Sequence, residues 1–150
     1  MALMSEPDRP TLVLERILPV SPAAVFRAWT DPDSLRVFMC AGDFTSALVD
    51  ADVRVGGRFR IVMREPSRDV EHTGEYRTVD PPRRLAFTWV SPSTGPAGSL
   101  VTIDLSPDAR GTRLVLTHEQ LPDAEIVARH SRGWTSILEK LERHLGTRAG

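Results

Sequence analysis

The chain of 150 residues has a single cysteine, Cys40, no long hydrophobic run and no excess of charge, with a formal net charge of -1. One cysteine cannot form an intrachain disulfide, so a cytoplasmic location is expected. No stretch approaches the ~18 apolar residues of a membrane span. Residues 1–10 lack the basic-then-apolar pattern of a secretory signal, which predicts a disordered tail. Acidic and basic residues are interspersed, and the absence of a basic stripe argues against a nucleic-acid partner.

The motifs of several large enzyme classes are also missing. The four histidines, His72, His118, His130 and His144, show neither zinc-ligand spacing nor an accompanying cysteine pair, so no metal is expected. Gly56-Gly57 lacks the lysine and the following helix of a phosphate-binding loop, and there is no Gly-x-Ser-x-Gly elbow. Without these motifs, the sequence indicates no cofactor and gives no support to a serine hydrolase.

What the sequence does contain is a regular alternation of apolar and polar residues between Gly57 and His118. A period of two places each set on one face of a strand. The apolar face also carries two imidazoles and a phenol. Five strands are predicted from its members, which are Phe59, Ile61, Met63, His72, Gly74, Tyr76, Leu85, Phe87, Trp89, Val101, Ile103, Leu105, Leu114, Leu116 and His118.

Two further strands precede these five. Residues Thr11–Leu18 predict the first, and Asp43–Asp52 predict a weaker second one. Pro66–Asp69 and Asp80–Pro82 are predicted turns, and Ser91–Ser99 is the longest predicted loop of the sheet.

Three helices are indicated. Ser21 before Pro22 and Asp31 before Pro32 are N-cap signals for two short helices in succession. After Gln120 the pattern changes to a helical stripe, which predicts one long helix ending at Gly146; its members are Ile126, Val127, His130, Trp134, Ile137, Leu138, Leu141 and Leu145.

This order of elements predicts an α+β fold, because the strands are grouped rather than alternating with helices. A twisted antiparallel sheet of about seven strands curls, and a long amphipathic helix can lie on its concave side. We therefore expect one helix-grip domain over residues 11–146, with residues 147–150 as a tail.

The chain resembles the bacterial homologues of the activator of heat-shock protein 90 ATPase, within the START-like (SRPBCC, Bet v 1-like) superfamily. The resemblance extends from Val13 to Leu145. It is carried by six stretches in the family's order, namely Ala28–Pro32, Val55–Arg60, His72–Tyr76, Pro82–Trp89, Gly111–Leu114 with Thr117-His118, and Gly133-Trp134.

The resemblance implies the helix-grip fold and a cavity between the sheet and the long helix. It also leaves open a homodimer and a chaperone partner, since relatives are often dimers. Family members often carry a tryptophan after the second short helix, where this chain has Phe38-Met39-Cys40. That segment is expected to border the cavity mouth, which implies a difference in ligand size or shape.

Such a cavity is a candidate ligand site. An empty apolar void of ~300 Å³ would cost roughly 7 kcal/mol at about 24 cal/mol per Å³, so a void of that size should be hydrated or occupied. We expect a small hydrophobic or aromatic ligand, and the predicted ligand-binding residues are Phe38, Phe59, Met63, His72, Tyr76, Phe87, Trp89, His118, His130 and Trp134.

Each of these residues also has a structural interpretation. The aromatic set could fill a core, His72 and His130 could be core histidines, and His118 could be a hydrogen-bonding residue at a strand end. Gly74 could admit a ligand to the backbone or relieve a bend. Gly133, inside a helix, allows either close approach of the helix to the sheet or room for a ligand beside Trp134.

Three functions follow, and binding of a small hydrophobic ligand in the cavity is favoured. The first alternative is a co-chaperone-like module that stimulates a heat-shock protein 90 ATPase, although the activators use an N-terminal domain that is absent here. The second is a cyclase, dehydratase or hydrolase that uses a cavity histidine or tyrosine as acid–base. Its support is fold analogy, which does not fix function.

Overall fold

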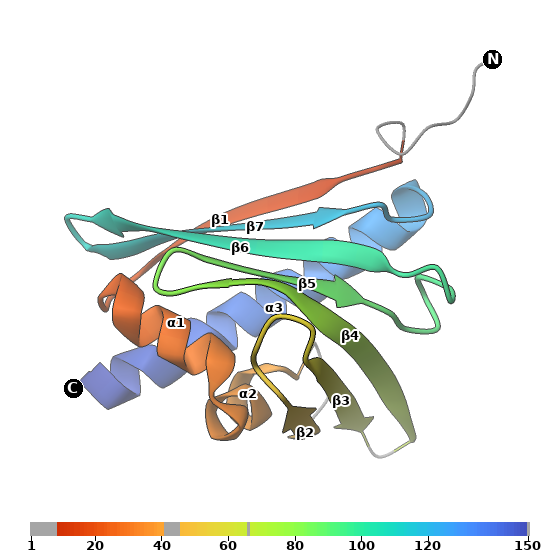
Figure 1. Ribbon diagram of the computed structural model, residues 1–150, viewed down its shortest axis with the longest axis horizontal. Helices are drawn as coiled ribbons and strands as arrows, with labels where there is room; N and C mark the ends of the chain where they lie inside the picture. The colour runs from red at the N-terminus through yellow and green to blue at the C-terminus, as the bar shows by residue number, and fades with distance from the viewer. Residues whose placement is uncertain (1–8, 41–45, 66, 150) are drawn as a thin grey trace.

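Seven strands form one antiparallel sheet in the order β1-β7-β6-β5-β4-β3-β2, and three helices accompany it (Figure 1). The computed structural model describes residues 9–40, 46–65 and 67–149. The predicted α+β helix-grip fold is confirmed. The elements are β1 (Leu12–Leu18), α1 (Pro22–Thr30), α2 (Pro32–Phe38), β2 (Ser46–Ala51), β3 (Arg58–Glu65), β4 (Arg68–Asp80), β5 (Arg84–Trp89), β6 (Ser99–Asp108), β7 (Gly111–Glu119) and α3 (Ala124–Ala149).

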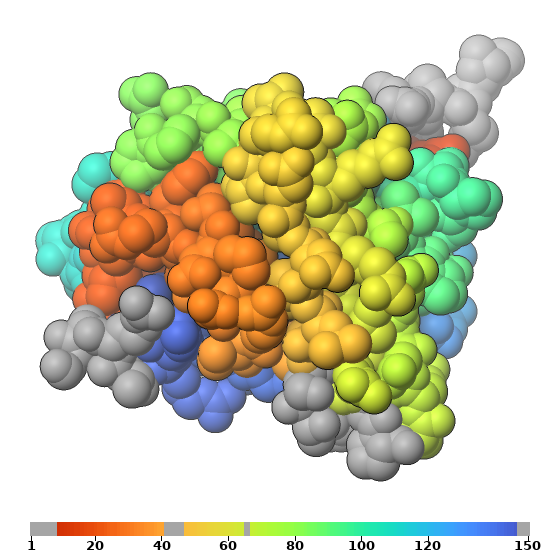
Figure 2. All heavy atoms as spheres, turned by 60° about the horizontal axis from the view of Figure 1, so that its bottom comes forward, coloured from red at the N-terminus to blue at the C-terminus, as the bar shows by residue number. Residues whose placement is uncertain are grey.

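The two short helices begin where the capping residues predict. The Ser21 hydroxyl accepts a hydrogen bond from the Ala24 amide at 3.2 Å, and an Asp31 carboxylate oxygen accepts one from the Asp33 amide at 3.0 Å. Each cap satisfies an amide that the helix itself leaves unpaired. Figure 2 shows α1 and α2 packed beside the β2–β3 hairpin, where they close one end of the sheet.

Strand β4 bends the sheet. Its first half, Arg68–Glu75, pairs with β3, and its second half, from Tyr76 on, pairs with β5 with a register shift between Tyr76 and Thr78. A Cβ on Gly74 would overlap both the Thr88 carbonyl oxygen and the Phe59 ring. The glycine therefore permits the bend, and the Phe59 ring fills the space that a ligand would need to reach the backbone there.

Helix α3 crosses the concave face of the sheet (Figure 1). It buries Trp134, Ile137, Leu138, Leu141 and Leu145, as the helical stripe predicts. Within the described residues, no helix is long and apolar enough to cross a membrane.

Two element boundaries differ from the sequence prediction. Helix α3 continues to Ala149, past the expected end at Gly146, because Gly146 is not among the glycines with positive φ and so forms no left-handed cap. Strand β4 begins at Arg68, inside the expected Pro66–Asp69 turn, because Glu65 and Arg68 still pair in the ladder. Residues 1–8 of the predicted tail 1–10, residues 43–45 of the predicted second strand, and Pro66 lie outside the described residues.

Candidate functional site

A cavity of about 460 Å³ lies between the first half of β4, the loop after β5, and the middle of α3. Arg68, Pro92, Ser93 and Arg129 are its exposed residues, and we call them the mouth. The size falls within the range of small-molecule sites. The full lining is Met63, Arg68, Val70, His72, Trp89, Pro92, Ser93, Arg129, His130, Gly133, Trp134 and Ile137.

Aromatic rings in tilted contact form the inner wall of the cavity. Trp89 and Trp134 lie 5.1 Å apart between ring centroids, and His72 lies 4.8 Å from Trp89. Strand periodicity places His72 and Trp89 on the inward face, and Gly133-Trp134 faces them from α3. A wall of this kind offers flat apolar area to a ligand.

The other half of the same sheet face is filled. Phe59, Phe87 and Tyr76 make mutual ring contacts, with centroids 5.4 Å apart for Phe59–Phe87 and 5.5 Å for Phe59–Tyr76. The space they share with Trp29 and Met39 amounts to about 10 Å³, too little for a ligand. Burial raises the pKa of Tyr76 to about 12, so its phenol stays neutral. This half is core rather than binding site.

His118 lies behind Trp134 and is fully buried. The Trp134 indole Nε1 donates a hydrogen bond to His118 Nδ1 at 3.0 Å. The Ser99 hydroxyl lies 2.6 Å from His118 Nε2 and 2.9 Å from the Trp89 carbonyl oxygen.

These contacts fix the protonation of His118. An indole N–H can only donate, so Nδ1 must be the unprotonated nitrogen. Nε2 then carries the proton and donates to the Ser99 hydroxyl, which in turn donates to the Trp89 carbonyl. Burial lowers the pKa of His118 to about 3, which agrees with a neutral ring. Both nitrogens are engaged, so His118 supports the site as a hydrogen-bonding residue of the core.

The two histidines of the cavity wall are also neutral near pH 7. Burial lowers the pKa of His72 to about 4, more than the carbonyls of Ile61 and Val70 raise it. Neither carbonyl reaches Nδ1 of His72 with hydrogen-bond geometry, and this atom has no partner among the described residues.

Burial lowers the pKa of His130 as well, and the neighbouring Arg129 charge adds to this shift. His130 Nδ1 lies 2.9 Å from the Ile126 carbonyl oxygen. A carbonyl only accepts, so Nδ1 donates and Nε2 of the neutral ring remains as an acceptor.

The structure divides the predicted ligand-binding residues into two groups. Met63, His72, Trp89, His130 and Trp134 line the cavity together. Phe38, Phe59, Tyr76, Phe87 and His118 do not line it. Phe38 packs on Trp29 with centroids 5.1 Å apart and is fully buried. Met39 and Cys40 are buried too, and neither lines the cavity.

Sequence reasoning missed the polar residues of the mouth. Arg68 stands in a predicted turn, and Arg129 stands on the exposed side of the helical stripe, next to His130. The sequence signal for Arg68 is its place two and four residues before Val70 and His72, on the same strand face. The signal for Arg129 is its position beside His130. Gly133, for which the sequence left open either close approach of the helix to the sheet or room for a ligand, lies at the cavity wall.

The described residues contain no group of three or more His, Cys, Asp or Glu side chains placed to hold a metal ion. Cys40 is buried, and burial raises the pKa of its thiol. A thiol with a raised pKa is a poor nucleophile, so Cys40 contributes to the core as a small hydrophobic residue.

Many solved structures share this fold. A protein named AHSA1 from Silicibacter pomeroyi is 29% identical, with a TM-score of 0.80 over 93% of this chain and 99% of that one. Protein CV1439 from Chromobacterium violaceum is 26% identical, with a TM-score of 0.79 over 91% and 97%. A Staphylococcus aureus protein of unknown function, at 19% identity and a TM-score of 0.80 over 94% and 96%, shows the fold alone.

The comparison with curated proteins gives no match. The family described as "Activator of Hsp90 ATPase homolog 1-like protein" matches residues 19–146, which is most of the chain. The resemblance seen in the six sequence stretches is thereby confirmed. The chain belongs to the Activator of Hsp90 ATPase homolog 1-like family.

Proposed function

We propose that the protein binds a small, mainly apolar molecule in the cavity between β4 and α3. The observation that supports this most directly is the cavity of about 460 Å³ beside the Trp89–Trp134 wall. The same sheet face is filled to about 10 Å³ at its other end, so of these two parts of the inward face the one beside His72 is the hollow one. An apolar ligand there would gain burial against rings that are already ordered, which lowers the entropic cost of binding.

The cavity can be tested with N-phenyl-1-naphthylamine, a neutral dye whose fluorescence rises in apolar surroundings. We expect saturable binding of one dye per chain. Gly133→Leu places a side chain into the cavity and should abolish binding. Gly146→Leu is the matched control, because Gly146 lies on the same helix, outside the cavity, with nothing within 4 Å of an added Cβ.

A second blocking variant guards against misfolding of Gly133→Leu. Ser93 is exposed in the loop after β5, so Ser93→Trp should fold and still obstruct the mouth. Absence of dye binding to the native protein would refute the proposal. So would equal binding to the native protein, Ser93→Trp and Gly133→Leu, with far-ultraviolet circular dichroism unchanged.

Family membership favours a second candidate, contact with a chaperone of the heat-shock protein 90 type. The description of the family refers to activation of that ATPase. Its test is the ATP turnover of the purified chaperone with and without this protein, together with co-migration on a sizing column. Unchanged turnover and separate migration would exclude this candidate while leaving ligand binding untouched.

A further inference from the structure

The inner wall of the cavity carries four rings that contain nitrogen. They belong to His72, Trp89, His130 and Trp134, and the other side chains of the lining away from the mouth are apolar. Which of the ring nitrogens remain available decides which polar group a ligand can carry past the mouth.

Neither indole N–H is available to a ligand. Nε1 of Trp134 donates its hydrogen bond to His118 at 3.0 Å. Nε1 of Trp89 is buried, so a molecule in the cavity does not reach it. The two tryptophans therefore offer a ligand their ring faces, and the hydrogen-bonding groups of the wall are the imidazoles.

His130 offers an acceptor. Its Nδ1 donates to the Ile126 carbonyl oxygen of the same helix, at 2.9 Å, which leaves the lone pair on Nε2. Burial lowers the pKa of this ring, so Nε2 stays unprotonated near pH 7. The nearest imidazole, His118, lies 4.9 Å away between ring centroids and gives its own proton to Ser99. Nε2 of His130 has no donor among the described residues.

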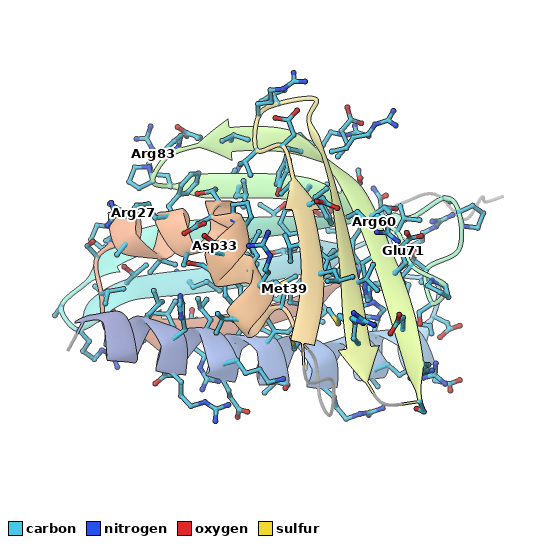
Figure 3. All side chains as sticks on the ribbon, turned by 90° about the horizontal axis from the view of Figure 1, so that it is seen from below. Arg27, Asp33, Met39, Arg60, Glu71 and Arg83 are labelled. Atoms are coloured by element: carbon cyan, nitrogen blue, oxygen red, sulfur yellow. The ribbon has the colours of Figure 1, made fainter. Side chains whose placement is uncertain are left out.

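His72 meets a ligand from the sheet side. Its Nδ1 is buried without a partner among the described residues, so any hydrogen bond from His72 to a ligand is made through Nε2. The acid beside it in the chain, Glu71, points to the opposite face of β4 and pairs there with Arg60, as Figure 3 shows. A hydroxyl group suits Nε2 of His72 in either protonation state, because it both donates and accepts.

We infer that the ligand of this cavity is a neutral molecule with a hydroxyl group, which donates a hydrogen bond to Nε2 of His130 while the apolar body lies against Trp89 and Trp134. This rests on the proposed function and specifies the ligand's chemical class, an apolar phenol or alcohol. An ether, ester or carboxylate has no proton for Nε2. It would cover this acceptor and leave it unpaired, which costs binding free energy.

The test compares 4-butylphenol with 4-butylanisole, in which a methyl group replaces the hydroxyl proton. Each is titrated against the N-phenyl-1-naphthylamine complex at pH 7, and displacement gives its affinity. The added methyl group and the weaker hydration of the anisole affect binding to every variant alike. The readout is therefore the ratio of the two affinities, compared between the native protein and its variants.

His130→Phe keeps an aromatic ring and removes Nε2. We expect the preference for 4-butylphenol over 4-butylanisole to fall about three- to tenfold in this variant, as loss of one neutral hydrogen bond would give. His144→Phe is the matched control. It makes the same substitution on α3 at another half-buried histidine, which does not line the cavity, and should leave the ratio unchanged.

A second measurement uses the native protein and does not depend on a variant that folds. In long-range ¹H–¹⁵N correlation spectra at pH 7, Nε2 of His130 should appear as an unprotonated nitrogen. A hydrogen bond donated to its lone pair changes its shielding, so 4-butylphenol should shift this resonance and 4-butylanisole should shift it much less. Equal shifts with the two compounds would overturn the inference.

The outcomes separate the two proposals. If the dye binds but the affinity ratio is the same in the native protein and His130→Phe, the hydroxyl inference is wrong and the cavity remains a binding site. The same holds if the dye binds and 4-butylphenol does not displace it. If neither compound nor the dye binds the native protein, both proposals are wrong.

Discussion

The indole N–H of Trp134 points at Nδ1 of His118, at 3.0 Å, and both side chains are buried. The contact joins α3 to β7, and His118 lies on the side of Trp134 away from the cavity lining. We predict that His118 is neutral, with its proton on Nε2. Long-range ¹H–¹⁵N correlation spectra at pH 7 should show an unprotonated Nδ1. A protonated Nδ1 would contradict the donor assignment of Trp134.

The buried neutral state of His118 should appear in the pH dependence of stability. Its pKa is about 3 in the folded chain and near 6.5 when exposed, so below pH 6.5 the unfolded state binds a proton that the folded state does not. Stability should therefore fall as pH decreases from 6.5 towards 3, by about 1.4 kcal/mol per pH unit for one such group. Above pH 6.5 this group contributes no pH dependence.

Urea unfolding of the native protein and His118→Asn, at several pH values between about 6 and 4.5, isolates this contribution. His72, with a pKa lowered to about 4, adds a similar slope to both proteins and cancels in the comparison. The carboxylates cancel in the same way. We expect the variant to have the shallower slope, whatever its absolute stability. Parallel slopes would show that His118 is not buried in neutral form.

The two tryptophans of the wall should respond differently to loss of the indole N–H. Both are 2% exposed, but Trp134 Nε1 has a partner, whereas Trp89 Nε1 has none among the described residues. Trp134→Phe leaves a buried imidazole nitrogen unpaired, and Trp89→Phe removes an unpaired donor. We therefore expect Trp134→Phe to cost about 1–3 kcal/mol more than Trp89→Phe. Equal losses in urea unfolding would count against this difference.

Local patterns were sufficient for most of the fold. The caps at Ser21 and Asp31 start α1 and α2, and the period of two gives the inward face of each strand. The stripe through Trp134 gives the buried side of α3. These features depend on residues close together in the chain, which is why the sequence alone predicts them.

The division of the inward face into a filled half and a hollow half was not predictable in this way. Alternation shows that Phe59 and Trp89 face inward, but it does not show which side chains of other elements reach them. Trp29 and Met39, from α1 and the end of α2, fill the space over Phe59. The side chains around His72 instead leave the cavity of about 460 Å³ unfilled. The position of a cavity is a property of long-range packing, and so is the placement of Arg68 and Arg129 along one cavity lining.

Gly74 and Gly146 differ in whether the surrounding structure requires a glycine at that position. At Gly74 an added Cβ would overlap the Thr88 carbonyl and the Phe59 ring, and neither backbone nor packed ring can move freely. Gly74→Ala should therefore lower the free energy of unfolding by about 1–3 kcal/mol, as overpacked cores do.

Gly146 is exposed near the end of α3 with nothing within 4 Å of an added Cβ. There alanine should raise stability by up to about 0.5–1 kcal/mol through its better helix propensity. Urea unfolding of both variants decides the point. A Gly74→Ala protein as stable as Gly146→Ala would mean that β4 does not need its close approach to Phe59.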